Sequence, residues 1–221
     1  GLSSSNDNGD TLFTNLKNIV NAEMSNGSSD LSISHIDSAT KGDSDSATLT
    51  LSGAIKGASV VPTFTETAPS GTGGLETLSV TSSGSANNVN ITSGQNSLET
   101  INVNGAQNFT TEITSTSLKT VDASSFTGKL DVTYAAAVDL TVKGGSGNDT
   151  VTFSADNFTS ADTVDGGAGT DVLEINSAVT AATLLKKVSN VETLKFVAGS
   201  AHDVTLAADA NVMNFDFTST G

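Results

Sequence analysis

Two nine-residue segments of the chain carry glycines and an aspartate at the spacing of a calcium-binding turn. They read Gly-Gly-Ser-Gly-Asn-Asp-Thr-Val-Thr at 144–152 and Gly-Gly-Ala-Gly-Thr-Asp-Val-Leu-Glu at 166–174. The first fits the calcium repeat G-G-x-G-x-D-x-U-x, where U is apolar, at every defined position; the second fits when Leu173 is taken as a tolerated variation. Glycine lets the backbone turn its carbonyl oxygens inward, and aspartate adds a charged oxygen. Because Ca²⁺ takes about six to eight oxygen ligands, the pattern predicts two calcium turns.

One such turn supplies only half of a calcium site, so a stacked turn must supply the rest. The two glycine starts are 22 residues apart, which is one coil of a stacked structure. Residues 153–165 form a longer return arm without a second glycine turn, so we expect calcium on one side only. Asp162 and Asp165 either complete the outer edge of the site or are solvated surface carboxylates. The main candidate ligands are the side chains of Asp149 and Asp171 and the carbonyl oxygens of Gly145, Gly147, Gly167 and Gly169.

Short rows of alternating apolar and polar residues run along most of the chain. Each row is rich in β-branched residues and is bounded by Gly, Asn, Ser or Asp, which is typical of β-strands. Examples lie at 31–36, 47–51, 89–91, 129–133, 138–142, 203–206 and 214–217. Only Thr11 to Met24 and Val179 to Val188 have apolar residues at helical spacing. We therefore expect an all-β fold with one or two short helices.

A repeated phrase indicates how the strands are arranged. Leu-Glu-Thr-Leu-Ser-Val at 75–80 matches Leu-Glu-Thr-Ile-Asn-Val at 98–103, and echoes follow at 118–121, at 191–196 and, more weakly, at 15–20. The first three copies start 23 and then 20 residues apart, a period typical of a solenoid in which each coil stacks on its neighbour. A β-sandwich also has many short strands but does not predict this spacing. We expect a parallel β-solenoid, or β-roll, with Leu98, Ile101 and Val103 pointing into the stack.

Composition excludes several classes of protein. The 221 residues carry 24 Asp and Glu against nine Lys, a formal net charge of -15, which repels nucleic acid and anionic membranes. No apolar run approaches the roughly 20 residues of a membrane span. Cysteine is absent, so an extracellular chain of this kind needs a clamp other than disulfides, and the acidity suggests metal.

The sequence offers little for catalysis. The histidines are His35 and His202, and no metalloprotease, nucleophile-elbow or P-loop motif is present. His35 lies in a β-type row, where a packed or surface role is expected. A polysaccharide lyase or hydrolase on a β-helix is the remaining enzyme class, but the chain has 5% aromatic residues for a sugar-binding face. We expect no enzyme activity.

The phrases at 144–154 and 158–171, with Val-Asp-Ala-Ser at 121–124, resemble RTX-type surface-layer (S-layer) proteins of Gram-negative bacteria. The resemblance covers roughly residues 75–197. It implies type I secretion through an uncleaved C-terminal signal, calcium-dependent folding outside the cell and assembly into a two-dimensional coat. The nonapeptide is shared by RTX adhesins, proteases and lipases, so it is more specific for calcium and secretion than for an S-layer.

We therefore expect a fragment of a secreted, cell-surface structural protein. Residues 1–70 form a β-rich cap or a continuation of the solenoid, and 71–221 form an RTX-like β-solenoid. The expected partners are Ca²⁺, other copies of the chain in a lattice, and cell-surface polysaccharide or lipopolysaccharide. Two alternatives are an RTX adhesin or glycan-binding module, and the calcium-binding secretion domain of a secreted enzyme.

Overall fold

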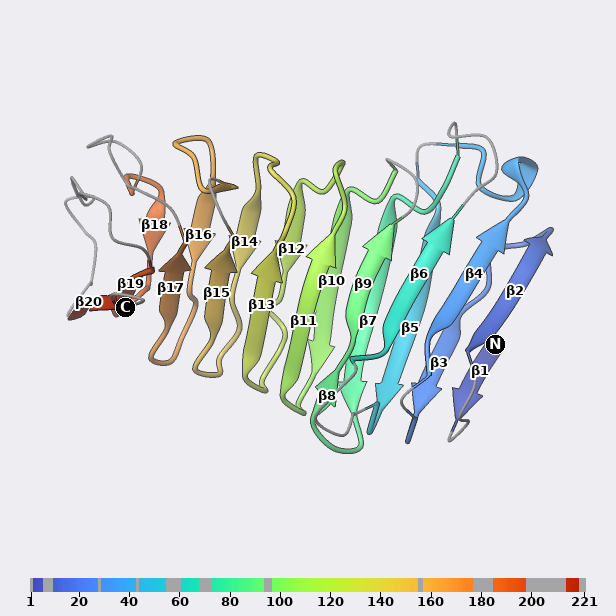
Figure 1. Ribbon diagram of the computed structural model, residues 1–221, viewed down its shortest axis with the longest axis horizontal. Helices are drawn as coiled ribbons and strands as arrows, with labels where there is room; N and C mark the ends of the chain where they lie inside the picture. Colours follow the sequence, from blue (N-terminus) through green and yellow to red (C-terminus); the bar gives the residue numbers. More distant parts are fainter. Residues whose placement is uncertain are drawn as a thin grey trace.

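A computed structural model of the chain describes residues 2–5, 10–27, 29–42, 44–54, 61–67, 73–93, 97–154, 157–176, 185–197 and 214–218. Its strands form two sheets, and every strand pair among the described residues is parallel. From β1 to β19 the chain alternates between the sheets, so each coil adds one strand position to each of them (Figure 1). The molecule is a parallel β-solenoid, as the sequence predicts.

The first sheet has nine strands and the second has eleven. In spatial order, the first contains β1 (Leu2–Ser5), β3 (Ala22–Ser25), β5 (Ser46–Ser52), β7 (Thr77–Ser83), β10 (Thr100–Gly105), β12 (Thr120–Asp122), β14 (Thr141–Lys143), β16 (Thr163–Asp165) and β18 (Val188–Ser189). The second contains β2 (Thr11–Leu16), β4 (Leu31–His35), β6 (Thr63–Thr67), β9 (Asn90–Ser93), β11 (Phe109–Thr114), β13 (Leu130–Tyr134), β15 (Thr150–Phe153), β17 (Val172–Ile175), β19 (Thr193–Val197) and β20 (Asn214–Thr218), with β8 (Asn87–Asn88) also on β11.

The repeated phrase sets the register of the stack. Leu78 lies beside Ile101 and Ile101 beside Val121, so equivalent residues of the first three copies are direct neighbours on the first sheet. The copy at 191–196 instead lies on β19 of the second sheet, where Leu194 lies beside Leu173. In both sheets the phrase occupies the corner where a coil enters a strand. The phrase therefore marks a corner that leads into a strand, and that strand can belong to either sheet.

The core lies between the sheets and is filled by the inward residue of each alternating row. Leu98, Ile101 and Val103 are buried, as predicted. Aromatic rings add to it in the later coils, where Phe153 packs against Tyr134 and Phe158 with ring centres 5.3 and 5.0 Å apart. Outward residues are mainly Thr, Ser and Asn, and these β-branched and small polar side chains suit the solvent face of a pleated sheet.

The predicted helix over Thr11 to Met24 is wrong. This segment forms β2 and β3, which pair with β4 and β5. Asn15, in the left-handed region at φ 57°, interrupts the register between the two halves of β2. Its apolar residues gain more from covering the end of the core than helix propensity offers, since propensity is a weak preference that packing overrides.

The second predicted helix, Val179 to Val188, falls largely outside the described residues, and its last residue begins β18. A 3₁₀ turn lies at Asp37–Ala39, and the sequence did not predict it.

Strands on both sides of residue 70 belong to the same sheets, because β5 pairs with β7 and β6 with β9.

We predict that Gly105→Ala destabilises the solenoid by at least about 2 kcal/mol. Gly105 has φ 108°, and a Cβ there would lie 2.1 Å from the backbone oxygen of Ser82 in the preceding coil. The control is Gly42→Ala, whose Cβ would meet nothing closer than 3.7 Å. Chemical denaturation measures both variants, and equal stabilities would contradict this account of coil contact.

Candidate cation-binding turns

The two glycine turns stack directly on each other, as their 22-residue spacing predicts. β14 pairs with β16 and β15 with β17, which brings the second turn onto the first. A Cβ on Gly167 would lie 2.3 Å from the Gly145 oxygen, and one on Gly169 would lie 2.2 Å from the Gly147 oxygen. The Gly145 oxygen also accepts the N–H of Ala168 at 2.9 Å. Only glycine permits this close approach between the two backbones.

Asp149 has both carboxylate oxygens occupied by backbone donors. Its side chain is 1% exposed. Oδ1 accepts the N–H of Leu130 in the preceding coil, and Oδ2 accepts the N–H of Gly145 in its own turn, both at 2.8 Å. Burial raises the pKa of this carboxyl, and the two hydrogen bonds act in the opposite direction. Asp149 thus ties its turn to the coil before it.

Asp171 occupies the equivalent position one coil later but is only half satisfied. Its Oδ1 accepts the N–H of Asp149 at 2.7 Å, whereas Oδ2 is buried and has no hydrogen-bond partner among the described residues. The N–H of Gly167, whose counterpart in the first turn binds Asp149, donates instead to Asp165 Oδ1 at 3.1 Å. The second turn has a different backbone conformation, because Gly167 and Gly169 have φ of 92° and 138° while the first-turn glycines are not in the positive-φ region.

The environment of Asp171 is unfavourable to its own negative charge. The pKa of Asp171 is raised to about 6, mainly by burial and also by the nearby charges of Asp149, Glu192 and Asp165, whereas the hydrogen bond from the Asp149 N–H lowers it. A bound cation stabilises a carboxylate that is desolvated and surrounded by acids, because it offsets the lost hydration and the repulsion. The second turn therefore has the electrostatics of a cation site.

At Gly144 and at Gly166, a backbone carbonyl oxygen and a carboxylate oxygen both approach the glycine α-carbon. A Cβ on Gly166 would lie 1.9 Å from the Asn190 oxygen and 2.8 Å from Asp171 Oδ2; a Cβ on Gly144 would lie 1.9 Å from the Gly166 oxygen and 3.0 Å from Asp149 Oδ2. Carbonyl and carboxylate oxygens are the ligand types that Ca²⁺ takes, so each pair fits its ligand chemistry. Among the described residues no three His, Cys, Asp or Glu side chains form a metal-binding group, so carbonyls and water must complete any such site.

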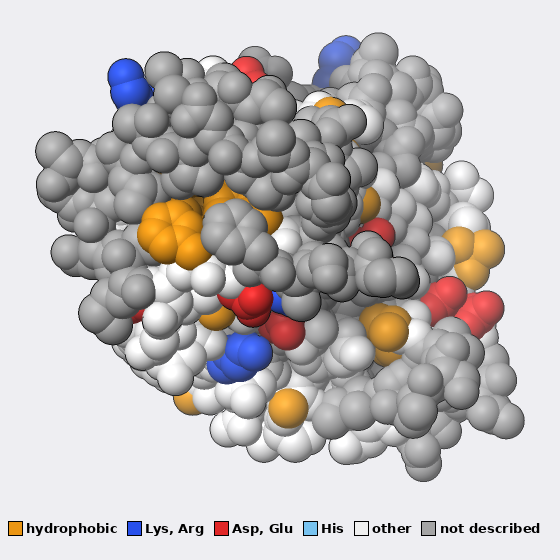
Figure 2. Space-filling view, turned by 60° about the vertical axis from the view of Figure 1, so that its left-hand side comes forward, with side chains coloured by type: hydrophobic (Ala, Val, Ile, Leu, Met, Phe, Trp, Pro, Cys, Tyr) orange, Lys and Arg blue, Asp and Glu red, His pale blue; other side chains and the backbone are white. Residues whose placement is uncertain are grey.

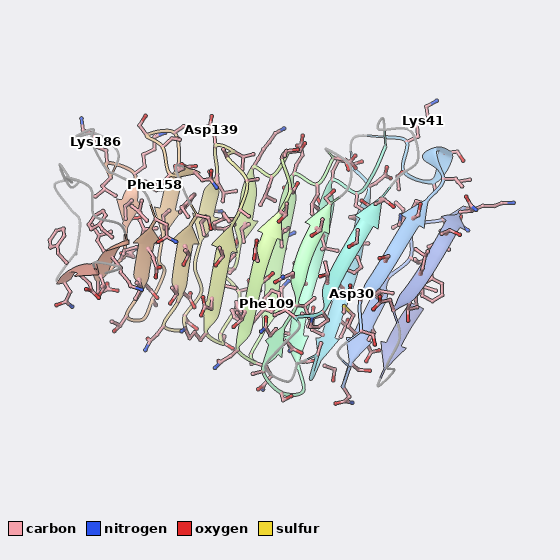
Figure 3. The ribbon with its side chains drawn as sticks, viewed as in Figure 1. Asp30, Lys41, Phe109, Asp139, Phe158 and Lys186 are labelled. Atoms are coloured by element: carbon pink, nitrogen blue, oxygen red, sulfur yellow. The ribbon has the colours of Figure 1, made fainter. Side chains whose placement is uncertain are left out.

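Asp162 and Asp165, the candidates for the outer edge of the site, lie at opposite ends of β16. Asp165 is at the turn, where its Oδ1 also accepts the Asn190 side-chain N–H at 2.7 Å. Asp162 is buried at the other corner, which Asp139 marks in Figure 3, and it accepts the N–H groups of Leu140 and Thr159 at 2.7 and 2.6 Å. The structure thus brings Asp165, but not Asp162, to the glycine turns.

The sequence reasoning missed two residues that face the second turn. Asn190 has φ 50°, a left-handed conformation that Asn tolerates better than most residues. Glu192 accepts the N–H of Asp171 on Oε2 at 2.7 Å. The available signal was the spacing, because Glu192 follows Asp171 by 21 residues, one coil. Without glycines around it, Glu192 was considered only as part of a strand phrase.

Of the two histidines, His35 lies in the described part of the chain. His35 is packed in the core, 1% exposed, with Nδ1 3.4 Å from Oε1 of the equally buried Glu66. Its Nε2 has no partner among the described residues. His202 lies outside the described residues.

Comparison of the chain with protein-family models, with curated proteins and with solved structures finds no match. The resemblance to RTX surface-layer proteins therefore rests on the sequence phrases alone. In the part of the chain that the structure describes, no helix has the length and apolar character to cross a membrane.

We predict that Asp162→Ala destabilises the protein by about 2–4 kcal/mol, because two buried N–H groups lose a charged acceptor. Since Asp162 lies away from the turns, this loss is the same in calcium and in chelator. Asp139→Ala, an exposed acid at the same corner, is the matched control and leaves stability nearly unchanged. A destabilisation of Asp162→Ala that vanishes in chelator would instead make Asp162 a metal ligand.

Proposed function

We propose that this chain is a structural segment of a secreted, calcium-dependent surface-layer protein that assembles into a two-dimensional lattice. The observation that carries the proposal is the stacked pair of glycine turns with the buried, unpaired Oδ2 of Asp171 beside the Asn190 carbonyl. A calcium ion in these turns has oxygen ligands from both backbone and side chain. The resemblance to RTX surface-layer proteins supplies the extracellular setting.

Calcium and secretion form one mechanism in this proposal. Where free calcium is scarce, the buried carboxylates of the turns penalise folding, and the chain remains competent for export. Outside the cell, calcium binds the folded coils and not the unfolded chain, so its binding free energy adds to the stability of the fold. The absence of cysteine suits this route, because an unfolded chain then forms no wrong crosslinks.

The distribution of charge supports a lattice bridged by cations. Lys119 pairs with Glu99, Lys143 with Asp122 and Lys195 with Glu174, so these lysines neutralise acids of their own chain. Figure 2, which brings the C-terminal end forward, shows acidic and basic side chains next to each other. With a net charge of -15, copies that approach one another repel unless a divalent cation lies between them.

A second candidate function, an adhesin or a module that binds cell-surface glycan or lipopolysaccharide, is favoured by one surface. Strands β5, β7 and β10 are the longest of the first sheet, and their outward residues carry hydroxyl or amide groups and no charge. These residues are Ser46, Thr48, Thr50, Ser52, Thr77, Ser79, Thr81, Ser83, Thr100, Asn102 and Asn104. Such a face suits hydrogen bonding to sugar hydroxyls.

We predict that millimolar calcium raises the thermal midpoint by roughly 5–10 °C over excess chelator, which corresponds to a concentration about 100 times Kd. Magnesium gives no such rise, because it dehydrates reluctantly and requires a stricter octahedral geometry. An unchanged midpoint in calcium would reduce the glycine turns to ordinary turns.

A lattice gives a separate expectation for electron microscopy. The protein forms ordered sheets in calcium that dissolve on exhaustive chelation, because the cation bridges acidic faces. Monodisperse particles that bind cells or glycans in calcium would favour the adhesin, and sheets that survive chelation would exclude cation bridging.

A further inference from the structure

We infer that the principal cation site is formed by the second glycine turn and the following coil, at 166–171 and 189–192, with Asp171 and the Asn190 carbonyl as ligands and Glu192 as the neighbouring carboxylate. The inference rests on the proposed calcium function and assigns it to one place. The segment 189–192 carries no glycine and does not have the spelling of a calcium turn. The nonapeptide pair alone places the site one coil earlier.

The first turn is already closed by hydrogen bonds. Asp149 binds Leu130 N–H with one oxygen and Gly145 N–H with the other, and its side chain is buried. A cation that takes Asp149 Oδ2 must compete with the Gly145 N–H, which points at the same oxygen. This turn therefore holds its shape without an ion.

The second turn is open at the equivalent oxygen. The N–H of Gly167 donates to Asp165, so Asp171 Oδ2 has no hydrogen-bond partner among the described residues, although Asp171 is only 1% exposed. A buried, unpartnered carboxylate oxygen is costly; among the described residues Asp45 Oδ2 and Glu66 Oε2 share this state, but only Asp171 Oδ2 lies at the glycine turns. Three nearby acids, Asp149, Asp165 and Glu192, act on its charge, which favours a cation over a neutral donor.

The position of the Asn190 oxygen supplies the second ligand. This oxygen and Asp171 Oδ2 both approach the α-carbon of Gly166, where a Cβ would lie 1.9 and 2.8 Å from them, so the two oxygens are at most 4.7 Å apart. Two oxygens bound to one calcium at about 2.4 Å can be separated by up to about that distance. The left-handed backbone of Asn190 and its side-chain bond to Asp165 fix this carbonyl in place.

Glu192, in the following coil, lies beside Asp171. Its Oε2 accepts the N–H of Asp171, which holds the carboxylate group beside that residue. The side chain is only half-buried, so Glu192 can turn its other oxygen toward an ion or toward water. Ligand charge tunes calcium affinity, and Glu192 thus strengthens the site whether it binds directly or through water.

The test is calorimetric titration of the whole chain with Ca²⁺, combined with thermal melts in chelator at pH 7.5. Asp171→Asn abolishes binding at this site yet melts in chelator at or above the wild type, because it removes an unpaired buried charge. Glu192→Gln keeps an acceptor for the Asp171 N–H and weakens calcium binding by at least about tenfold. Asp149→Asn, the matched comparison, lowers the chelator midpoint through a lost hydrogen bond; it also removes one of the three nearby charges, so it weakens calcium binding without abolishing it as Asp171→Asn does.

Several outcomes would overturn the assignment. If Asp149→Asn loses calcium while Glu192→Gln keeps the wild-type Kd, the ion lies between the nonapeptides and this inference is wrong, although the calcium function stands. If the wild type binds no calcium at all, the proposed function fails together with the assignment. Circular dichroism in chelator shows whether each variant is folded. If Asp149→Asn does not fold, the calcium Kd of Glu192→Gln alone tests the assignment, and a Kd equal to that of the wild type would overturn it.

Discussion

In a stack of parallel coils, the buried backbone N–H groups at the corners need hydrogen-bond acceptors from a neighbouring coil. Within strands the sheet ladder does this, but at corners the ladder is interrupted and buried N–H groups need another acceptor. Side-chain oxygens fill this role along the solenoid: Asn108 accepts Lys129 N–H, Asp149 accepts Leu130 N–H and Asp162 accepts Leu140 N–H. Several acids of this very acidic chain are therefore structural acceptors rather than solvated charge.

Because these acceptors are carboxylates, the stability of the fold depends on the charges next to them. Asp149, Asp171 and Glu192 form a continuous series in which each acid accepts an N–H from the coil before it. The series brings like charges together in a buried place, and only Asp171 is left with an unpaired buried oxygen. In the proposed site, a cation would satisfy that oxygen and remove the repulsion, so cation binding would stabilise the stack of coils.

The sequence predicted the solenoid and part of its register, because the Leu-Glu-Thr phrase and its echoes recur at the start of β7, β10, β12 and β19. It failed for Thr11 to Met24, where apolar spacing fits both a helix and two alternating strands, and only stacking on β4 and β5 decides between them. It left open whether Asp162 and Asp165 complete the outer edge of the site or are solvated carboxylates; the strand β16 separates them, so that only Asp165 lies at the glycine turns. Glu192 was missed because its role depends on a coil without glycine spelling.

The most direct test of this account is a crystal structure of the chain grown with calcium and soaked in a lanthanide, read through its anomalous signal. The account predicts a peak within bonding distance of Asp171 Oδ2 and the Asn190 oxygen, with Glu192 in contact or one water away. A peak between the two nonapeptides would contradict the placement. No peak near either turn would contradict the role of the cation in holding the coils together.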